Sequence, residues 1–165
     1  MSGDPRDVVL REIRRDDRGR IEKILKSTRV FFDDEVAVAL ELFDIALNRP
    51  GQTDYIFIAA EFEGRLAGYA CWGPAPMTDK TYDLYWIAVD PEVHGRGVGK
   101  ALMGAVEHDL RQRGARKVFI ETGGREAYMP TRRFYEALGY TICARIPEFY
   151  RAGDDKVVFT RDLEE

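Results

Sequence analysis

A glycine-rich segment from residue 94 to residue 100 has the residue types and spacing of an anion-binding loop. It consists of His94, Gly95, Arg96, Gly97, Val98, Gly99 and Lys100. Its three glycines let the backbone approach a ligand closely, and a helical pattern begins within it, so that free amides and the positive end of a helix dipole point into the loop. The arginine and the lysine can add positive charge. The segment predicts a cradle for a phosphate or pyrophosphate group; a glycine-rich turn without a ligand is the alternative.

Two familiar nucleotide-binding motifs do not fit this segment. The dinucleotide fingerprint G-x-G-x-x-G would need a glycine where Lys100 or Leu102 stands. The P-loop would need a glycine at His94 and a serine or threonine at Ala101. A nicotinamide-cofactor enzyme stays an alternative because Glu121 follows the glycines by about 20 residues, a spacing typical of such enzymes.

The elements around the loop form a strand–helix–strand unit. Residues 81–89 (TYDLYWIAV) are predicted to be a strand that ends at Asp90-Pro91. Residues 97–113 carry apolar side chains at helical spacing, and Gly114 stands where a helix C-cap belongs. Residues 117–122 are predicted to be the next strand. Two strands joined in this way are expected to be parallel, with a right-handed crossover.

The rest of the chain alternates between predicted helices and strands without a convincing linker. Strands are expected at residues 8–13, 55–61, 65–73, 140–146 and 156–163, and helices at 17–28, 33–48 and 130–138. Asp33 or Asp34 is expected to cap the second of these helices. The pattern predicts one α/β (α+β) domain over residues 8–165, after a flexible tail of residues 1–7.

Composition narrows the class of partners. The chain has 165 residues and a formal net charge of -4 at pH 7, which argues against a general nucleic-acid binder. Cys71 and Cys143 each lie in an apolar stretch, so both are expected to be buried, and no disulfide framework is expected. The chain starts with polar residues and has no apolar run long enough to span a bilayer, so we expect a cytoplasmic protein without a membrane partner. No metal site is predicted.

Two blocks of the sequence resemble the GCN5-related N-acetyltransferase (GNAT) superfamily. The family pattern Gln/Arg-x-x-Gly-x-Gly/Ala is matched by residues 94–99, with His94 at the position that is usually glutamine or arginine. The pattern Leu/Phe-Tyr-x-x-x-Gly-Phe/Tyr is matched within Arg133–Tyr140. Tyr128 stands where the family often has an asparagine that touches pantetheine, so that contact is not transferred to this chain. In the order of its elements the resemblance extends over residues 8–163.

The resemblance implies a fold, a co-substrate and an acid. The fold is the single-domain acetyltransferase fold, with a mixed, mostly antiparallel sheet of about six to seven strands flanked by about four helices. The co-substrate is acetyl-CoA, with its pyrophosphate on the loop amides and its pantetheine arm on backbone groups of Ile87, Ala88 and Val89. Tyr135 corresponds to the acid that meets the departing sulfur. The alternative for Tyr135 is a core tyrosine of an amphipathic helix.

Acetyl transfer to an amine also needs a base, because a lysine-like amine of pKa about 10.4 is charged at neutral pH. Asp83 stands where histone-acetylating members of the superfamily have a glutamate. Glu121 stands where ribosomal-protein N-terminal acetyltransferases have theirs. The alternatives are that Asp83 is a solvent-facing strand residue, that Glu121 forms a salt bridge with Arg125 or Arg132, and that bulk water takes the proton.

The acceptor is expected between two aromatic segments. Phe31 and Phe32 stand beside three acidic residues, and Phe149 and Tyr150 are expected to form the opposite lip; a hydrophobic staple with an N-cap is the alternative for the first pair. The resemblance implies an acetyl-CoA-dependent N-acetyltransferase acting on a primary amine of a small molecule or a peptide. The alternatives are a protein N-terminal acetyltransferase of the ribosomal-protein type and a non-catalytic acyl-CoA sensor. The oligomeric state stays open, with a homodimer among the alternatives.

Overall fold

The computed structural model describes residues 7–164, so the expected N-terminal tail lies outside the described residues except for Asp7. The strands are β1 (Val9–Arg11), β2 (Ile56–Phe62), β3 (Arg65–Pro74), β4 (Thr81–Val89), β5 (Lys117–Gly123), β6 (Thr141–Arg151) and β7 (Asp154–Asp162). The helices are α1 (Arg18–Ser27), α2 (Asp33–Asn48), α3 (Val98–Gln112) and α4 (Met129–Ala137). Every strand and helix expected from the sequence is present, which confirms the predicted succession of elements.

The seven strands form one sheet in the order β1-β2-β3-β4-β5-β7-β6. The β4–β5 pair is parallel, as the strand–helix–strand pattern predicts. The pairs β1–β2, β2–β3, β5–β7 and β6–β7 are antiparallel. This mixed sheet with four helices confirms the predicted fold class.

Contacts divide the chain into two compact units, which we describe separately. The first unit comprises the described residues up to Gly73 together with Trp86–Asp109. The second unit comprises Pro74–Tyr85 and the described residues from Leu110 onward. The prediction of one domain over residues 8–165 stays a prediction.

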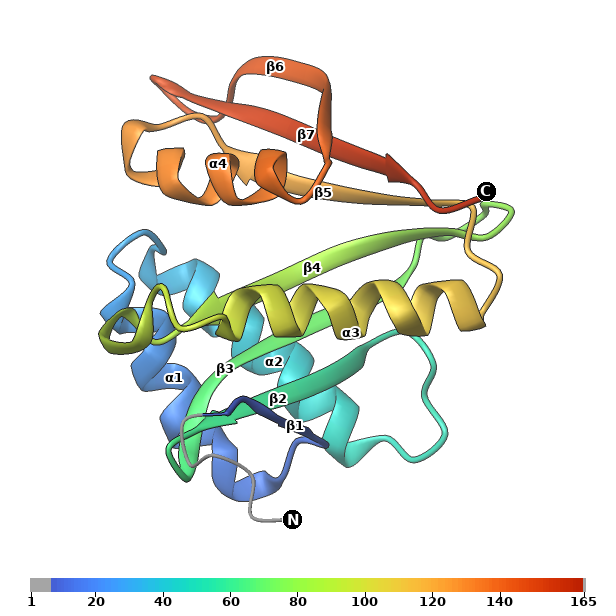
Figure 1. Ribbon diagram of the computed structural model, residues 1–165. Coiled ribbons are helices and arrows are strands. Elements are labelled where there is room, and N and C mark those ends of the chain that lie inside the picture. The colour runs from blue at the N-terminus through green and yellow to red at the C-terminus, as the bar shows by residue number, and fades with distance from the viewer. Residues whose placement is uncertain (1–6, 165) are drawn as a thin grey trace. The chain divides into compact units, whose positions relative to one another are not determined.

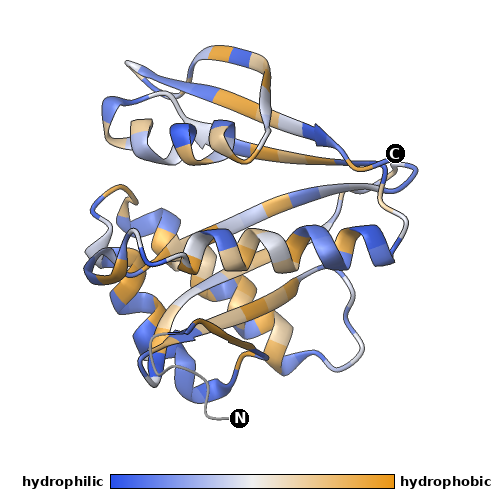
Figure 2. Cartoon of the chain, in the orientation of Figure 1, coloured by the Kyte–Doolittle hydropathy of each residue, from blue (hydrophilic) through white to orange (hydrophobic). Residues whose placement is uncertain are grey.

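In the first unit the core lies on both faces of the β2–β3 hairpin. Glu63 and Gly64 form its two-residue turn. Both have positive φ (54° and 79°), as in the type I′ turn, whose twist matches that of the two strands it joins. Helices α1 and α2 cover one face, and α3 covers the other (Figure 1). Rings of α2, β2 and β3 pack together: Phe57 lies edge-on to Phe43 at 6.0 Å and stacks on Tyr69 at 6.0 Å. The strands are accordingly hydrophobic along most of their length, whereas the outer faces of the helices are hydrophilic (Figure 2).

Gly68 permits a close approach of β3 to β4 in the first unit. A Cβ atom on Gly68 would lie 2.7 Å from the carbonyl oxygen of Ala88 and 3.2 Å from side-chain carbons of Val98 and Leu102. Such contacts are shorter than van der Waals distance and would force β3 away from β4 or from α3. Gly68 thus allows the strand that carries Ala88 to lie directly beneath α3.

We expect Gly68→Ala to lower the free energy of unfolding by about 1–3 kcal/mol, the usual cost of overpacking. Gly104→Ala is the matched control, because a Cβ on Gly104 of α3 meets nothing within 4 Å. That control should be neutral or stabilising by up to about 1 kcal/mol, because alanine is the better helix former. Urea unfolding of both variants measures the difference, and equal stabilities would contradict this account of the packing.

In the second unit α4 packs on one face of β5 and β7. Val118, Ile120, Val157 and Phe159 are all buried there. The buried Asp154 at the start of β7 forms ion pairs with Arg125 (3.3 Å) and Arg151 (3.2 Å). This carboxylate therefore ties the start of β7 to the segment after β5 and to the end of β6.

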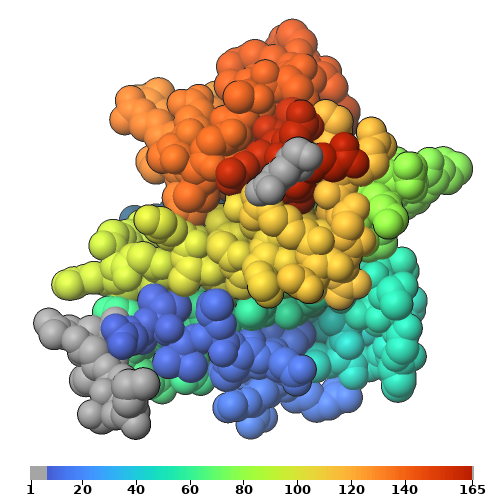
Figure 3. Space-filling view, turned by 45° about the vertical axis from the view of Figure 1, so that its right-hand side comes forward, coloured from blue at the N-terminus to red at the C-terminus, as the bar shows by residue number. Residues whose placement is uncertain are grey.

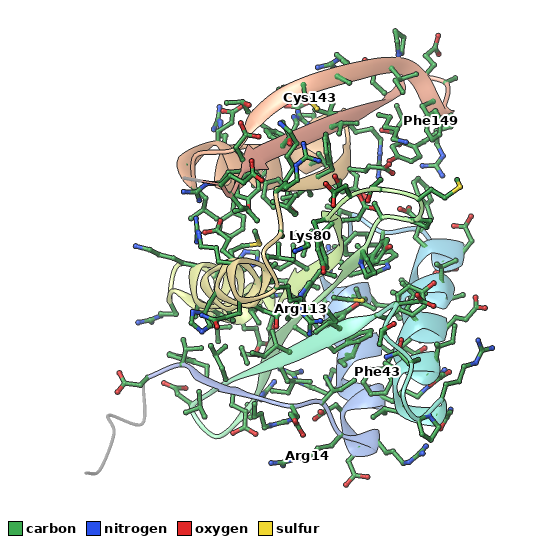
Figure 4. The ribbon with its side chains drawn as sticks, turned by 90° about the vertical axis from the view of Figure 1, so that its right-hand side faces the viewer. Arg14, Phe43, Lys80, Arg113, Cys143 and Phe149 are labelled. Carbon is green, nitrogen blue, oxygen red and sulfur yellow. The ribbon has the colours of Figure 1, made fainter. Side chains whose placement is uncertain are left out.

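The strand β6 overturns one expectation about the cysteines. Both cysteines are free, and Cys71 is buried as expected, but Cys143 is exposed. The reason is its position: β6 is an edge strand, and all eleven of its residues are exposed. Figure 4 shows Cys143 on this strand. An apolar neighbourhood in sequence did not imply burial here.

No helix within residues 7–164 is long and apolar enough to cross a membrane.

Candidate functional site

The predicted anion-binding loop joins β4 to α3 in the first unit. A short 3-10 helix (Pro91–Val93) follows β4, and α3 begins at Val98. Gly95 and Gly97 both have positive φ, 80° and 85°, a conformation that glycine adopts without strain. A Cβ at either position would meet nothing within 4 Å, so the space above both glycines is open. The loop and α3 lie on the surface of the molecule (yellow-green and yellow, Figure 3).

The loop presents a row of free backbone donors. The first helical hydrogen bond of α3 runs from the amide of Ala101 to the carbonyl of Gly97 (3.0 Å). Among loop residues 94–100, the backbone amides that have no acceptor are those of Gly95, Gly97, Val98, Gly99 and Lys100. Val98 is buried and holds the helix against the core, so these amides are positioned by packing. Free amides at the positive end of a 15-residue helix are suited to bind an anion.

Asp90 positions the entry to this loop. It is only 5% exposed, and it forms an ion pair with the guanidinium of Arg20 on α1. Its backbone amide donates to the carbonyl of Ala67 (2.7 Å), and its carboxylate accepts from the amide of Glu92 (3.0 Å). Arg20 also donates to the carbonyl of Leu66 (3.0 Å). These bonds join α1, β3 and the start of the loop.

A cluster of charged side chains lies on one face of the second unit's sheet. Glu121 on β5 and Lys156 on β7 form an ion pair with 2.9 Å between Oε1 and Nζ. Asp83 of β4 is paired in register with Phe119, which lies two residues before Glu121 on β5. Side chains two residues apart on a strand share a face, so Asp83, Glu121 and Lys156 lie on the same face. The ion-pair partner of Glu121 is Lys156, so the alternative that Glu121 pairs with Arg125 or Arg132 is wrong in its partner.

Asp83 has the environment of a proton acceptor. Burial of this half-buried side chain raises the pKa of its carboxyl above the usual value, and the negative charge of Glu121 raises it further. The ammonium of Lys156 acts in the opposite direction and lowers the pKa of Asp83. The carboxylate of Asp83 has no hydrogen-bond or ion-pair partner among the described residues. Its carboxylate is therefore available to a ligand, as the prediction of a base requires.

Tyr135 on α4 is a buried residue whose hydroxyl is not paired. The side chain is 3% exposed and its ring lies 5.5 Å from that of Phe159 and 6.1 Å from that of Tyr140. Burial raises the pKa of the Tyr135 phenol. In the described part of the chain no hydrogen bond of its hydroxyl is found. The residue is thus a buried core tyrosine, and its role as an acid stays a prediction.

Tyr135 and the carboxylates lie on opposite faces of the same sheet. Phe159, which contacts Tyr135, is paired with Ile120. Glu121 is the next residue along β5, and adjacent residues of a strand point to opposite faces.

The two predicted aromatic segments belong to different units. In the first unit Phe31 packs edge-on against Trp86 of β4 at 5.3 Å, and Phe32 is 39% exposed. Phe32 is the N-cap residue of α2, and its amide donates to Glu35 (3.0 Å). The expectation that Asp33 or Asp34 caps this helix is wrong, because both lie in its first turn.

In the second unit Phe149 and Tyr150 lie where β6 leaves the ladder. The pairing with β7 is interrupted between Ile146 and Arg151. The amide of Glu148, which has a positive φ of 50°, donates to the carboxylate of Asp155 (2.9 Å). This bond helps to hold the displaced segment, and it leaves Phe149 53% exposed. The ring of Phe149 (labelled in Figure 4) lies 4.4 Å from Nζ of Lys156.

Sequence patterns did not point to Arg20, Trp86 and Asp90 as functional residues of the first unit, or to Lys156 as one of the second. Trp86 stands within the predicted strand, where an aromatic residue needs no special explanation. The ion pairs of Lys156 and Arg20 join elements far apart in the chain, 35 residues in one case and 70 in the other. Such pairs depend on strand register and helix placement, which have no local sequence signal.

A model of the acetyltransferase (GNAT) family matches residues 14–140. The chain belongs to this family. The resemblance read from the two sequence blocks is thereby confirmed, and the expected enzyme class, an acyltransferase, is that of the family.

Individual relatives are similar to the chain to different extents. A crystal structure of a GNAT-family protein from Desulfovibrio desulfuricans is 42% identical, with a TM-score of 0.90 over 96% of this chain and 100% of that one. A protein from Salmonella typhimurium, solved with acetyl-CoA, is 20% identical, with a TM-score of 0.73 over 96% of this chain and 95% of that one, a likeness of fold. Mycothiol acetyltransferase of Saccharomonospora viridis is 32% identical over 110 residues, 59% of this chain and 35% of that protein. The chain thus spans about a third of the length of this curated relative.

Proposed function

We propose that this chain is an acetyl-CoA-dependent N-acetyltransferase that acts on a primary amine of a small molecule or a peptide. The observation that carries the proposal is the row of free amides at the glycine loop and the start of α3, in a chain of the GNAT family. We place the enzyme in the cytoplasm.

The loop fits the pyrophosphate of acetyl-CoA. The open space above Gly95 and Gly97 would admit the phosphates, and the free amides would donate to their oxygens. His94, Arg96 and Lys100 of the loop are exposed, and the arginine and the lysine would add positive charge. The related fold of the Salmonella protein with acetyl-CoA supports the same ligand. Backbone groups of Ile87, Ala88 and Val89 at the end of β4 would hold the pantetheine arm.

The acceptor nitrogen loses two protons and the departing sulfur gains one, so one proton is released overall. The ammonium of the acceptor gives its first proton to a carboxylate, and the nitrogen lone pair then forms a bond to the thioester carbonyl carbon. As the carbon–sulfur bond breaks, the nitrogen loses its second proton to water, and the thiolate gains one from an acid or from water. Deprotonating a lysine-like amine at neutral pH costs roughly 4–5 kcal/mol, which a positioned carboxylate can offset.

Asp83 or Glu121 would take the proton and Tyr135 would supply one. The candidate bases lie on one face of the second unit's sheet and Tyr135 lies on the other. The roles follow the positions that these residues occupy in the pattern of the GNAT family. The raised pKa of Tyr135 keeps its phenol protonated at physiological pH, as an acid must be.

The acceptor is a cation before it reacts, and the charged face suits one. Two carboxylates and one ammonium leave a net negative charge at Asp83, Glu121 and Lys156. The ring of Phe149 already has the ammonium of Lys156 on one face, and its exposed part is a candidate for acceptor contacts. Tyr150 beside it (ring centroids 5.1 Å apart) and the Phe31–Phe32 segment of the first unit are the further candidates for acceptor contacts.

Binding measurements test the co-substrate first. Acetyl-CoA should raise the melting temperature of the protein, because a ligand that binds only the native state stabilises it. NAD should leave the melting temperature unchanged, and longer acyl-CoA thioesters report the acyl preference. Binding of acetyl-CoA without thiol release in the presence of any amine would favour the sensor. Stabilisation by NAD alone would reject the proposal.

We expect Tyr135→Phe to lower kcat and kcat/KM together by about tenfold, with acetyl-CoA affinity nearly unchanged. Acid catalysis is typically worth about 10²–10⁴-fold, but a thiol of pKa about 8.5 leaves well without a proton, so the effect should lie below that range. Tyr140→Phe is the matched control, because it removes a hydroxyl from the same aromatic cluster. Initial rates and equilibrium binding measure both variants. A loss below about threefold for Tyr135→Phe, or an equal loss for Tyr140→Phe, would make Tyr135 a structural residue.

A further inference from the structure

Lys156 is held in a specific position on the charged face. Its side chain is 16% exposed, although lysine is usually a solvated residue. Nζ lies 2.9 Å from Oε1 of Glu121 and 4.4 Å from the centre of the Phe149 ring. The ammonium is therefore clamped between a carboxylate and an aromatic face.

The register of β5 and β7 produces the ion pair of this clamp. Lys156 of β7 is opposite Gly123 of β5, and Glu121 is opposite Val158. Glu121 and Lys156 are thus diagonal neighbours on one face, a separation that long side chains can bridge. The ion pair is consequently part of the sheet and does not depend on a loop.

The two carboxylates of this face have different partners. Glu121 is bound to the ammonium of Lys156. Asp83 has no such partner among the described residues, and it is the more buried of the two carboxylates. A carboxylate in an ion pair would have to give up that pair to accept a proton, whereas a free one would not.

We propose that Lys156 is a positioning residue of the acceptor site: it holds Glu121 in an ion pair and leaves Asp83 to receive the proton of the amine. This inference rests on the proposed function, and it goes further by choosing between the two candidate bases. Asp83 takes one proton from the acceptor nitrogen and becomes a neutral carboxylic acid. Lys156 keeps its own proton throughout, so it does not react.

Lys156 also sets the charge that Asp83 experiences. The other charged groups of this face are Lys117 of β5 and Asp162 of β7, which bind each other at 2.5 Å. Opposite Lys156 on β6 stands Ile146, which is uncharged; Arg145 beside it pairs with Asp155 (2.8 Å). Glu121 and Lys156 are thus the groups of the second unit whose charges act on Asp83. Their effects have opposite signs, so their removal should have opposite consequences.

Titration of Asp83 tests the inference without any acceptor. Carbon-13 NMR of the aspartate carboxyl groups over a range of pH gives the titration midpoint of Asp83 in the parent protein and in its variants. The Asp83 signal is assigned as the one that is missing from the Asp83→Asn spectrum. Lys156→Met keeps the aliphatic stem and removes the charge, so the Asp83 midpoint should rise. Glu121→Gln removes the negative neighbour, so the midpoint should fall. Lys156→Arg keeps the charge and should return the midpoint close to the parent value.

The pH profile of acetyl transfer tests the same inference in turnover. Acetyl transfer needs Asp83 ionised, so the rate should fall as the pH drops below the pKa of Asp83. This acid limb of the pH–rate profile should move to higher pH in Lys156→Met and to lower pH in Glu121→Gln. Glu121→Gln should lose less of the maximal rate than Asp83→Asn does, because Glu121 is not the base. A merely structural role of Lys156 would lower stability in Lys156→Met and leave both the limb and the midpoint in place.

Two results would overturn the inference. One is a midpoint of Asp83 that is the same in the parent, Lys156→Met and Glu121→Gln proteins. The other is a loss of turnover in Glu121→Gln that no change of pH restores, which would make Glu121 the base. The absence of acetyl transfer by the parent protein would instead count against the proposed function, and the NMR midpoints would still decide the role of Lys156.

Discussion

Gly97→Glu should weaken acetyl-CoA binding by at least about 100-fold while the protein remains folded. The carboxylate would enter the open space above the loop and would repel the pyrophosphate. A 100-fold loss corresponds to about 2.7 kcal/mol, comparable to one or two hydrogen bonds to a charged group, each about 1.5–3 kcal/mol. Isothermal titration calorimetry gives the affinity, and circular dichroism verifies the fold.

Two control variants separate this effect from backbone strain. Gly97 has a φ of 85°, so any side chain there pays a strain of about 1–2 kcal/mol. Gly97→Ala carries the strain without the charge and should bind acetyl-CoA better than Gly97→Glu. Gly51→Glu places the same side chain on another positive-φ glycine with open space around it, and it should bind normally. Unchanged acetyl-CoA affinity in a folded Gly97→Glu protein would show that the glycine loop does not bind the pyrophosphate.

Asp83→Asn should reduce kcat/KM for the amine by about 10²–10⁴-fold at neutral pH, the usual value of general base catalysis. Asparagine has nearly the same shape and cannot accept the proton. Acetyl-CoA affinity should stay within about twofold, because the carboxylate acts on the other substrate. Steady-state rates over a range of pH and a separate binding measurement give both quantities.

The pH dependence of the Asp83→Asn variant gives a second signature. As the pH approaches the pKa of the amine, about 10 for a lysine-like group, more acceptor is already neutral and the missing base matters less. The deficit should therefore shrink with rising pH. Asp162→Asn is the matched control on the same face, since Asp162 binds Lys117 at 2.5 Å, and its rate should remain near the parent value. A loss below about threefold in Asp83→Asn would assign deprotonation to solvent.

Local sequence patterns predicted those features that a single continuous segment of the chain forms. The glycine loop, the start of α3 and Gly114 after its end all depend on backbone conformation within a few residues. The structure places them where the spacing of glycines and apolar residues predicts. The parallel β4–β5 pair was also predictable, because a short helical crossover permits few topologies.

Features that join distant segments could not be predicted in the same way. The Glu121–Lys156 ion pair depends on the β5–β7 register, and a shift of one residue would place the two side chains on opposite faces. Cys143 has apolar neighbours in sequence but lies on an edge strand, and edge positions follow from the whole strand order. The cap of α2 differs from the expectation because the helix already begins at Asp33, which makes Phe32 the N-cap. Asp33 could be the N-cap only if the helix began at Asp34.

Mass spectrometry of a reaction with carbon-13-labelled acetyl-CoA tests the central claim most directly. The panel should contain small primary amines, peptides with a free N-terminus and peptides with a lysine. We predict labelled acetyl on the nitrogen of at least one primary amine, with one CoA thiol released for each acetyl group transferred and with the reaction lost in Gly97→Glu. Acetyl-CoA that binds tightly but yields no acetylated amine across the panel would contradict the account and would leave a protein that only senses the thioester.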